Sequence, residues 1–173
     1  MIDLRICPQC SSKSRSDYTR FFINKYIDKI NLNNKIIDLG CGRARNIYYL
    51  DKLGFKDITA IDINKFKEVD INKFNFIQAD LNNCIPLIKK YNIIICNYLF
   101  MFILDKEKLI NEITRIADDN AFCIVELNKK LLKNGIQYDF KEIINLFVVK
   151  GWNILNLRIR ENKFIAQKRS AFH

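Results

Sequence analysis

The chain has 173 residues, of which 49% are hydrophobic, and carries a net charge of +10. This is enough apolar material to bury the core of one sizeable domain, and we expect a single globular domain. The sequence has no uninterrupted apolar run of about 18 residues and no charged amino-terminal segment leading into a long apolar one, so it favours neither a membrane span nor a signal peptide and predicts a cytoplasmic protein.

The positive charge lies mainly at the two ends of the chain. Residues 1–35 contain seven Lys or Arg against three Asp or Glu, and residues 150–173 contain six against one. A surface built by these ends is a candidate binding site for nucleic acid or another polyanion.

Residues 1–16 are predicted to be an amino-terminal extension, and residues 17–173 the folded domain. In the extension, Cys7 and Cys10 have the spacing of half a zinc site. A structural zinc takes about four ligands, and neither a second pair nor a histidine lies nearby, so we predict no metal site within one chain. A second chain that supplies the other ligands is the alternative.

A helix is predicted to begin the domain at Asp17, whose side chain is available as the amino-terminal cap. The apolar residues that follow recur at helical spacing and share one face. They are Tyr18, Phe21, Phe22, Tyr26 and Ile30.

Short apolar runs then alternate with helical patterns. Strands are predicted at residues 35–39, 58–61, 74–78, 91–96 and 121–127, and helices at residues 43–53, 105–117 and 140–149. This order predicts an α/β fold with a single Rossmann-like, doubly wound and mostly parallel sheet. The segment after Asp62 is too short for a regular helix. Two final apolar runs flank Glu161 and Asn162, which predicts a C-terminal antiparallel hairpin.

The stretch "IIDLGCGRARNIYYL", residues 36–50, joins the first predicted strand to the next helix. Gly40, Cys41 and Gly42 form a predicted tight turn at the carboxyl end of the strand, where ligands of such sheets bind. Glycines let the backbone approach a ligand closely, and amides at a helix start receive a carboxylate or phosphate. A dinucleotide site is disfavoured because Arg45 stands at the sixth position, where that pattern has glycine. A P-loop is absent.

With Asp38 before the turn and Ala44 in place of a third glycine, this stretch resembles the first motif of class I S-adenosylmethionine-dependent methyltransferases. The resemblance covers about residues 18–168. It implies the class I methyltransferase fold, with the final strand inserted between its neighbours, and S-adenosylmethionine as the cofactor. It also implies that Asp38 and the turn residues Gly40, Cys41 and Gly42 belong to the cofactor site.

The resemblance continues at later strand ends. It implies that Asp62 accepts hydrogen bonds from both ribose hydroxyls of the cofactor, for which a carboxylate is a good double acceptor. It places Asp80 where family members contact the adenine amino group, with Leu81 beside the ring. Ile63, next to Asp62, and Asn97, at a later strand end, complete the implied cofactor contacts.

Within this superfamily the chain most resembles the tellurite-resistance TehB-type methyltransferases, through "DLGCGRARNIYYL", "LFMFI" and the pair Thr19-Arg20. This likeness implies that Arg20 reaches the methionine carboxylate of the cofactor, since arginine offers a fork matched to that group. It also implies that Arg45 and Asn46 begin the helix after the glycine turn, with Asn46 in the cofactor site. Residues 128–138 lack the histidine that the family carries over its acceptor site, which argues against tellurite as the substrate.

Asn97 and Tyr98 are the candidate catalytic residues. An amine acceptor needs a polar group that orients its lone pair and takes its proton, and Glu126 is a further candidate for this role. Residues 97–100 lack the paired prolines of amino-directed nucleic-acid methyltransferases, which argues against methylation of DNA amino groups. The one histidine is His173, so a histidine base is not expected. A thiolate or chalcogen anion as acceptor would need little help from a base.

Two functions therefore remain. The first is an S-adenosylmethionine-dependent methyltransferase, with a small-molecule acceptor favoured over RNA or protein. The alternative is a non-catalytic basic protein of the same fold that binds nucleic acid or a protein partner. An NAD-dependent oxidoreductase ranks third because the sixth-position glycine is missing.

Overall fold

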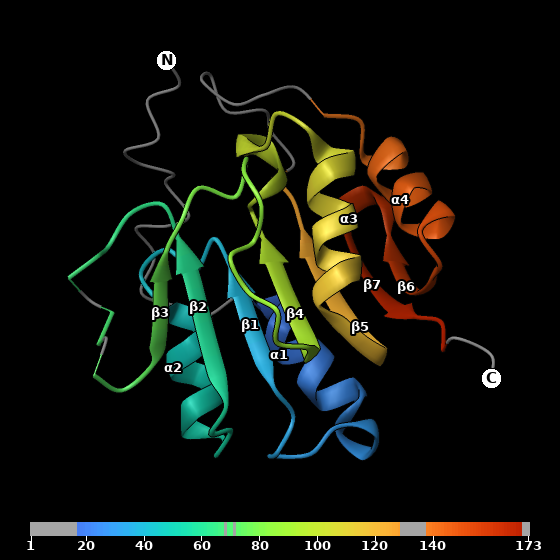
Figure 1. Ribbon diagram of the computed structural model, residues 1–173. Helices are drawn as coiled ribbons and strands as arrows, with labels where there is room; N and C mark the ends of the chain where they lie inside the picture. The colour runs from blue at the N-terminus through green and yellow to red at the C-terminus, as the bar shows by residue number, and fades with distance from the viewer. Residues whose placement is uncertain (1–16, 68, 71, 129–137, 171–173) are drawn as a thin grey trace.

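The computed structural model describes residues 17–67, 69–70, 72–128 and 138–170. A seven-stranded sheet forms its centre, in the order β3-β2-β1-β4-β5-β7-β6 (Figure 1). Strands β1 to β5 are parallel, whereas β7 is antiparallel to both β5 and β6. The strands are β1 (Ile36–Leu39), β2 (Ile58–Asp62), β3 (Asn75–Gln78), β4 (Tyr91–Asn97), β5 (Ala117–Glu126), β6 (Trp152–Arg158) and β7 (Lys163–Lys168).

This architecture confirms the predicted mostly parallel sheet, the C-terminal hairpin and the insertion of the final strand between its neighbours. Strand β5 begins at Ala117 rather than at residue 121, directly after the preceding helix. The expected extension, residues 1–16 with Cys7 and Cys10, lies outside the described residues, and the division into extension and domain stays a prediction.

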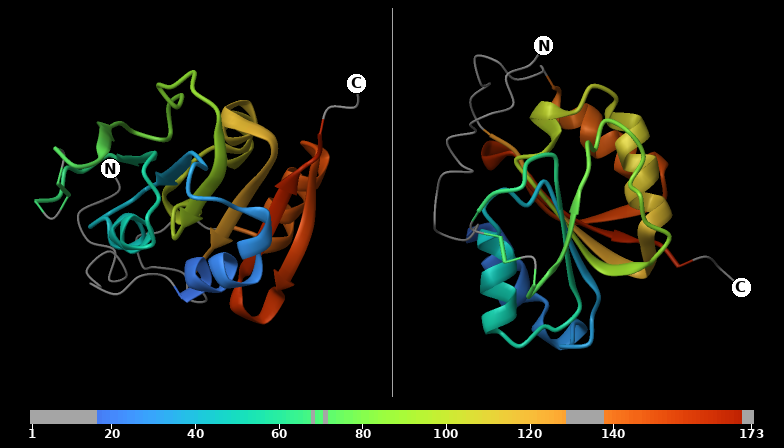
Figure 2. Two further views of the ribbon diagram at one scale, coloured as in Figure 1. Left: turned by 90° about the horizontal axis from the view of Figure 1, so that it is seen from below. Right: turned by 60° about the vertical axis from the view of Figure 1, so that its left-hand side comes forward.

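Four α-helices cover the two faces of the sheet in the part of the chain that the structure describes. Helices α1 and α2 pack on one face, and α3 and α4 on the other (Figure 2). Between β2 and β3 the described residues form turns and no helix, as the short segment predicted. The helices are α1 (Asp17–Lys25), α2 (Arg45–Lys52), α3 (Lys106–Ile116) and α4 (Phe140–Val149); short 3-10 helices occupy Ile27–Lys29, Phe100–Phe102 and Ile159–Glu161.

Helix α1 buries the apolar face expected from its spacing. Tyr18 and Phe22 are fully buried, and the Phe22 ring lies 5.3 Å from that of Phe122 on β5. Asp17 lies in the first helical turn rather than before it, where its carboxylate still complements the positive end of the helix dipole. The helix thereby places Thr19 beside the carboxyl end of β4, where its hydroxyl oxygen accepts a hydrogen bond from the Asn97 side chain.

On the opposite face, aromatic rings join α4 to the hairpin and to the loop after β4. The ring centroid of Phe147 lies 5.6 Å from that of Trp152, 5.2 Å from that of Phe164 and 6.3 Å from that of Phe100. Asp139 caps α4 by accepting a hydrogen bond from the backbone N–H of Lys141. This core anchors the segment that follows Asn97.

The parallel register brings three polar side chains to one edge of the sheet. Asp38 is paired with Ala60 on β2 and with Ile95 on β4, while Asp62 and Asn97 are the last residues of those two strands. Because parallel strands end at the same edge, residues distant in the sequence meet there. No helix in the described ranges has both the length and the apolar character needed to cross a membrane.

The aromatic core predicts a large difference between two adjacent residues of α4. Phe147→Ala removes a fully buried ring and should lower the free energy of unfolding by about 3–5 kcal/mol. Val148→Ala, at an exposed position, should change it by less than about 0.5 kcal/mol. Urea denaturation measures both values, and similar losses in the two variants would contradict the packing described for Phe147.

Candidate functional site

The turn between β1 and α2 has an unusual backbone. Gly40 and Gly42 have φ angles of 73° and 52°, in the left-handed region that glycine adopts without steric cost. Ala44, in the place of a third glycine, has φ of 60° and is fully buried. For an L-residue this conformation is less stable by about 1–2 kcal/mol. The backbone is therefore left-handed at all three positions of the turn, although only two of them are glycine.

Asp62, at the end of β2, fixes this turn. Its carboxylate accepts hydrogen bonds from the backbone N–H groups of Gly42 and Asn64, each at 2.8 Å, and Ile61 O accepts one from Gly40 N at 2.8 Å. The Asp62 side chain is only 9% exposed. This burial raises its pKa, while the backbone hydrogen bonds act in the opposite direction. A buried carboxylate therefore stands directly beside the glycine turn.

Asp38 is a second buried carboxylate at the same edge. It is 2% exposed and accepts a hydrogen bond from Asn46 Nδ2 at 3.4 Å. Burial raises the pKa of Asp38 to about 7; the charge of Arg45 and the hydrogen bond from Asn46 lower it, and the neighbouring Asp62 raises it further. The site thus contains an acid whose ionisation depends on nearby cations.

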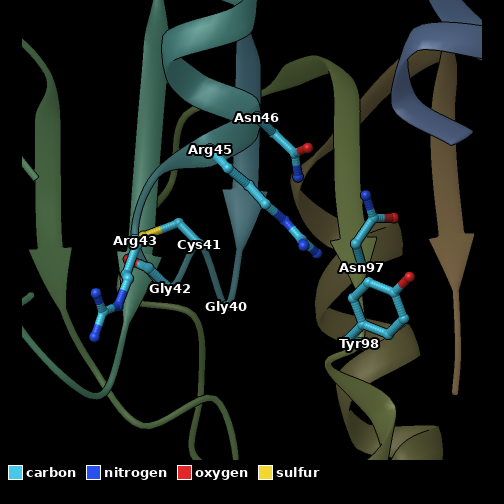
Figure 3. Close-up of a pocket in the computed structure, with 8 residues that line it drawn as sticks. All are labelled: Gly40, Cys41, Gly42, Arg43, Arg45, Asn46, Asn97 and Tyr98. Atoms are coloured by element: carbon cyan, nitrogen blue, oxygen red, sulfur yellow. Dashed lines mark hydrogen bonds between the residues drawn. The ribbon is translucent and has the colours of Figure 1, made fainter. Parts of the chain in front are cut away.

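A pocket separates the glycine turn from the end of β4 (Figure 3). The Arg45 side chain extends from the start of α2 toward Asn97 and Tyr98, whereas Arg43 points away from them. The guanidinium carbon of Arg45 lies 5.2 Å from the centroid of the Tyr98 ring. The lining residues are Gly40, Cys41, Gly42, Arg43, Arg45, Asn46, Asn97 and Tyr98.

Asn97 contributes a buried amide to this pocket. Its Nδ2 donates a hydrogen bond to Thr19 Oγ1 at 2.9 Å, which joins β4 to α1. The residue is 6% exposed, and its Oδ1 has no hydrogen-bond partner among the described residues. Leaving a buried acceptor unpaired costs about 1–3 kcal/mol, so a ligand that brings an N–H or O–H donor would be favoured here.

Tyr98, the residue after Asn97, has a strained backbone and donates a hydrogen bond to the buried Glu126. Its φ is 60°, which is uncommon for a bulky residue. Its hydroxyl donates a hydrogen bond to Glu126 Oε1 at 2.7 Å, and its backbone N–H donates to Glu126 O at 2.6 Å. Glu126 is 3% exposed and forms an ion pair with Lys163 at 2.9 Å.

The structure brings much of the predicted site together. Asp38 and Asp62 adjoin the pocket through their hydrogen bonds to Asn46 and Gly42. The predicted residues that line the pocket itself are Gly40, Cys41, Gly42, Asn46, Asn97 and Tyr98.

Other predicted residues lie outside the lining of this pocket. Ile63, Asp80 and Leu81 follow the ends of β2 and β3, at the same edge of the sheet, and Asp80 Oδ1 accepts a hydrogen bond from the backbone N–H of Asn82 at 2.9 Å. Arg20 lies on the surface of α1, where its guanidinium is 3.7 Å from the carboxylate of Asp17. In the described ranges, no group of three or more His, Cys, Asp and Glu side chains is arranged to hold a metal ion.

Sequence reasoning missed four residues of this region: Thr19, Arg43, Arg45 and Lys163. The position of Arg45 directly after the glycine turn was a usable signal, since the first residues of that helix border the ligand site. Thr19 was noted only as part of the family likeness and without a role, and Lys163 gave no signal, because α1 and β7 bring them to Asn97 and Glu126 only in the folded chain.

Comparison with known proteins matches residues 13–152 to the family model described as a methyltransferase domain. A curated relative, the probable S-adenosyl-L-methionine-dependent methyltransferase TehB of Haemophilus influenzae, is 32% identical over 83 residues. That match covers 43% of this chain and 28% of the relative, so the chain spans less than a third of that protein.

Two solved structures share the fold at low sequence identity. The cyclase SpnF superposes with a TM-score of 0.74 at 10% identity, covering 90% of this chain and 81% of SpnF. Magnesium protoporphyrin IX methyltransferase from Synechocystis PCC 6803, solved with bound SAM, gives a TM-score of 0.67 at 18% identity, covering 88% of this chain and 78% of that protein. Likeness at this level concerns the fold alone, and the two names differ in their chemistry.

The raised pKa of Asp38 predicts a pH-dependent stability. Between its ordinary value of 3.8 and about 7, the unfolded chain releases the Asp38 proton and the folded chain keeps it, so rising pH lowers the stability of the folded state. Asp38→Asn removes this penalty. Its free energy of unfolding, relative to the unsubstituted protein, should therefore increase by about 1 kcal/mol or more from pH 5 to pH 8.

Urea denaturation at the two pH values measures this difference. Asp28→Asn, at an exposed position in the 3-10 helix Ile27–Lys29, provides the baseline for a lost surface charge. A difference between Asp38→Asn and the unsubstituted protein that stays the same at pH 5 and pH 8 would contradict the assignment.

Proposed function

The chain belongs to the methyltransferase domain family, and on this premise we propose that it is an S-adenosylmethionine-dependent methyltransferase. It binds S-adenosylmethionine at the edge formed by the glycine turn and the ends of β2 and β4, transfers the methyl group to an acceptor and releases S-adenosylhomocysteine. The observation that carries this proposal is the buried Asp62 carboxylate that clamps the glycine turn at Gly42 N.

The polar groups of the site fit the parts of this cofactor. Each oxygen of Asp62 accepts one backbone N–H, and a carboxylate has further lone pairs that can accept from two ribose hydroxyls. The unpaired Asn97 Oδ1 suits the ammonium group of the methionine part. Bound S-adenosylmethionine supplies an electrophilic methyl group on a positively charged sulfur, and the buried carboxylates of Asp38 and Asp62 favour a cation beside them.

Arg45 is the cation placed to hold the carboxylate of the methionine part. It lines the pocket opposite Asn97 and Tyr98, and its charge acts on Asp38. Arg20, to which the family likeness pointed, lies on the surface beside Asp17. An arginine can bind a carboxylate with two parallel hydrogen bonds, which also fixes the orientation of the ligand.

The acceptor is proposed to be a small molecule. The loop after Asn97 lacks the paired prolines that hold a flipped base in amino-directed nucleic-acid methyltransferases, and the magnesium protoporphyrin IX methyltransferase of similar fold is named for a small molecule. Binding of nucleic acid to the basic ends and a cytoplasmic location stay predictions from the sequence.

Isothermal titration calorimetry with S-adenosylmethionine and S-adenosylhomocysteine, with NADH as the control ligand, tests the cofactor assignment. We expect binding of the first two ligands and none of NADH. Asp62→Ala and Asp62→Asn should weaken S-adenosylhomocysteine binding by about tenfold or more, because hydrogen bonds to a charged group are lost. Asp57→Ala, at the other end of β2, is the matched control and should bind normally.

Failure of the unsubstituted protein to bind either adenosyl ligand would overturn the proposed function and favour the non-catalytic alternative. Unchanged affinity in both Asp62 variants would contradict the ribose contact alone. Thermal unfolding of each variant separates lost contacts from lost structure, since Asp62 also supports the turn.

The role of Arg45 is tested by comparing two ligands. S-adenosylhomocysteine has the amino acid part, and 5′-methylthioadenosine lacks it. Arg45→Met should weaken the first by about tenfold and leave the second unchanged, since only the first has a carboxylate. Arg20→Met is the control and should change neither. Equal losses for the two ligands in Arg45→Met would show a general defect of the site instead.

A further inference from the structure

Tyr98, Glu126 and Lys163 form a connected polar network beside the pocket. The Tyr98 hydroxyl donates to Glu126 Oε1 at 2.7 Å, and Lys163 Nζ lies 2.9 Å from the same oxygen. Tyr98 directly follows β4, Glu126 is the last residue of β5 and Lys163 is the first residue of β7. Strand pairing fixes the arrangement, because Glu126 is opposite Asn97 on one side and opposite Lys163 on the other.

The backbone and the burial of this network point to a role beyond packing. Tyr98 takes a left-handed conformation, a strain that persists only where the surroundings impose it and that clusters at functional sites. Glu126 is almost fully buried, and a buried carboxylate is costly unless it is paired. Here Lys163 supplies the pairing charge, so the carboxylate can remain beside the Tyr98 hydroxyl.

One end of the network reaches the proposed methyl-transfer site. Tyr98 lines the pocket together with Gly40 and Asn97, and its ring faces the guanidinium of Arg45. The opposite end continues to Glu161, whose carboxylate lies 3.5 Å from Lys163 Nζ. Glu161 lies in the turn of the hairpin, so a polar route runs from the pocket wall toward the surface of the molecule.

We propose that Tyr98 is the group that receives the proton of the methyl acceptor, and that Glu126 is its positioning residue and proton store. This inference rests on the proposed function and specifies its acceptor as a neutral molecule with an N–H or O–H group. A phenol takes part in proton transfer when a base is within hydrogen-bond distance, and Glu126 meets that condition.

The step is balanced in atoms and electrons. The acceptor nitrogen or oxygen forms a bond to the methyl carbon with its lone pair, and the electron pair of the carbon–sulfur bond stays with the sulfur. The acceptor proton passes to Tyr98 Oη while the phenolic proton passes to Glu126. Glu126 then releases that proton to solvent after the products have left, which restores the starting state.

The charges of the network also select against anionic acceptors. A thiolate or chalcogen anion has no proton to give, so it would leave the pair of Tyr98 and Glu126 without a role. Its charge would also be repelled by Glu126, while the nearby Lys163 is already engaged with that carboxylate. An amine or a hydroxyl meets neither obstacle.

Sinefungin tests this inference without the acceptor. In this analogue of S-adenosylmethionine a carbon that carries an amino group replaces the methyl-bearing sulfur, so the amino group probes the surroundings of the transferred methyl. Tyr98→Phe and Glu126→Gln should weaken sinefungin binding by about tenfold, because a charge-assisted hydrogen bond is lost. Both should leave the affinity for S-adenosylhomocysteine, which lacks the amino group at this place, within about twofold.

Calorimetry on the 173-residue chain gives both affinities, and Tyr48→Phe on α2 is the matched control that should change neither. Tyr98→Phe keeps the ring that faces Arg45, so it remains informative if Glu126→Gln unfolds. Equal weakening of the two ligands would reduce the network to a structural role and overturn the inference, as would unchanged binding of sinefungin. If the unsubstituted protein binds S-adenosylhomocysteine in these experiments, the proposed cofactor assignment stands whatever the variants do.

Discussion

The hydrogen bond from Gly42 N–H to the Asp62 carboxylate is the contact on which the candidate site depends. It ties the end of β2 to the turn after β1, so that the turn, the start of α2 and the buried acid form one unit. The turn contains three residues in the left-handed conformation, which persists only where the surrounding contacts impose it. Without the hydrogen bond to Asp62, the backbone of the turn could adopt another conformation. The turn forms the wall of the pocket that faces Asn97 and Tyr98.

Three carboxylates are buried around the site of a chain whose net charge is positive. The chain carries a net charge of +10, yet Asp38, Asp62 and Glu126 are all buried around the carboxyl edge of the sheet. Buried carboxylates are expensive, and here each has hydrogen bonds or a cation beside it: Asp62 has backbone amides, Glu126 has Lys163, and the charge of Arg45 acts on Asp38. A cationic ligand would add to this compensation, which is the electrostatic argument for S-adenosylmethionine.

The C-terminal hairpin contributes to the chemistry as well as to the fold. Because β7 inserts antiparallel between β5 and β6, its first residue, Lys163, lies opposite Glu126, the last residue of β5. A parallel strand in that place would bring its other end to this edge. The insertion thereby supplies the charge that lets a glutamate remain buried beside Tyr98, and the same strand carries Phe164 into the aromatic core under the loop after β4.

The sequence alone determined the sheet class, the main helices and the glycine turn, because alternating apolar runs and glycine spacing are local properties of the chain. The acids at the strand ends were singled out by the family resemblance. The same resemblance pointed to Asn97 and Tyr98, at the start of the loop after the fourth strand. The tertiary structure decided that Arg43 and Arg45 line the pocket, whereas Arg20 lies beside Asp17 on the surface. It also decided that Thr19 contacts Asn97 and that Lys163 pairs with Glu126. These contacts join residues distant in the chain, so they follow from helix docking and strand order rather than from any local pattern.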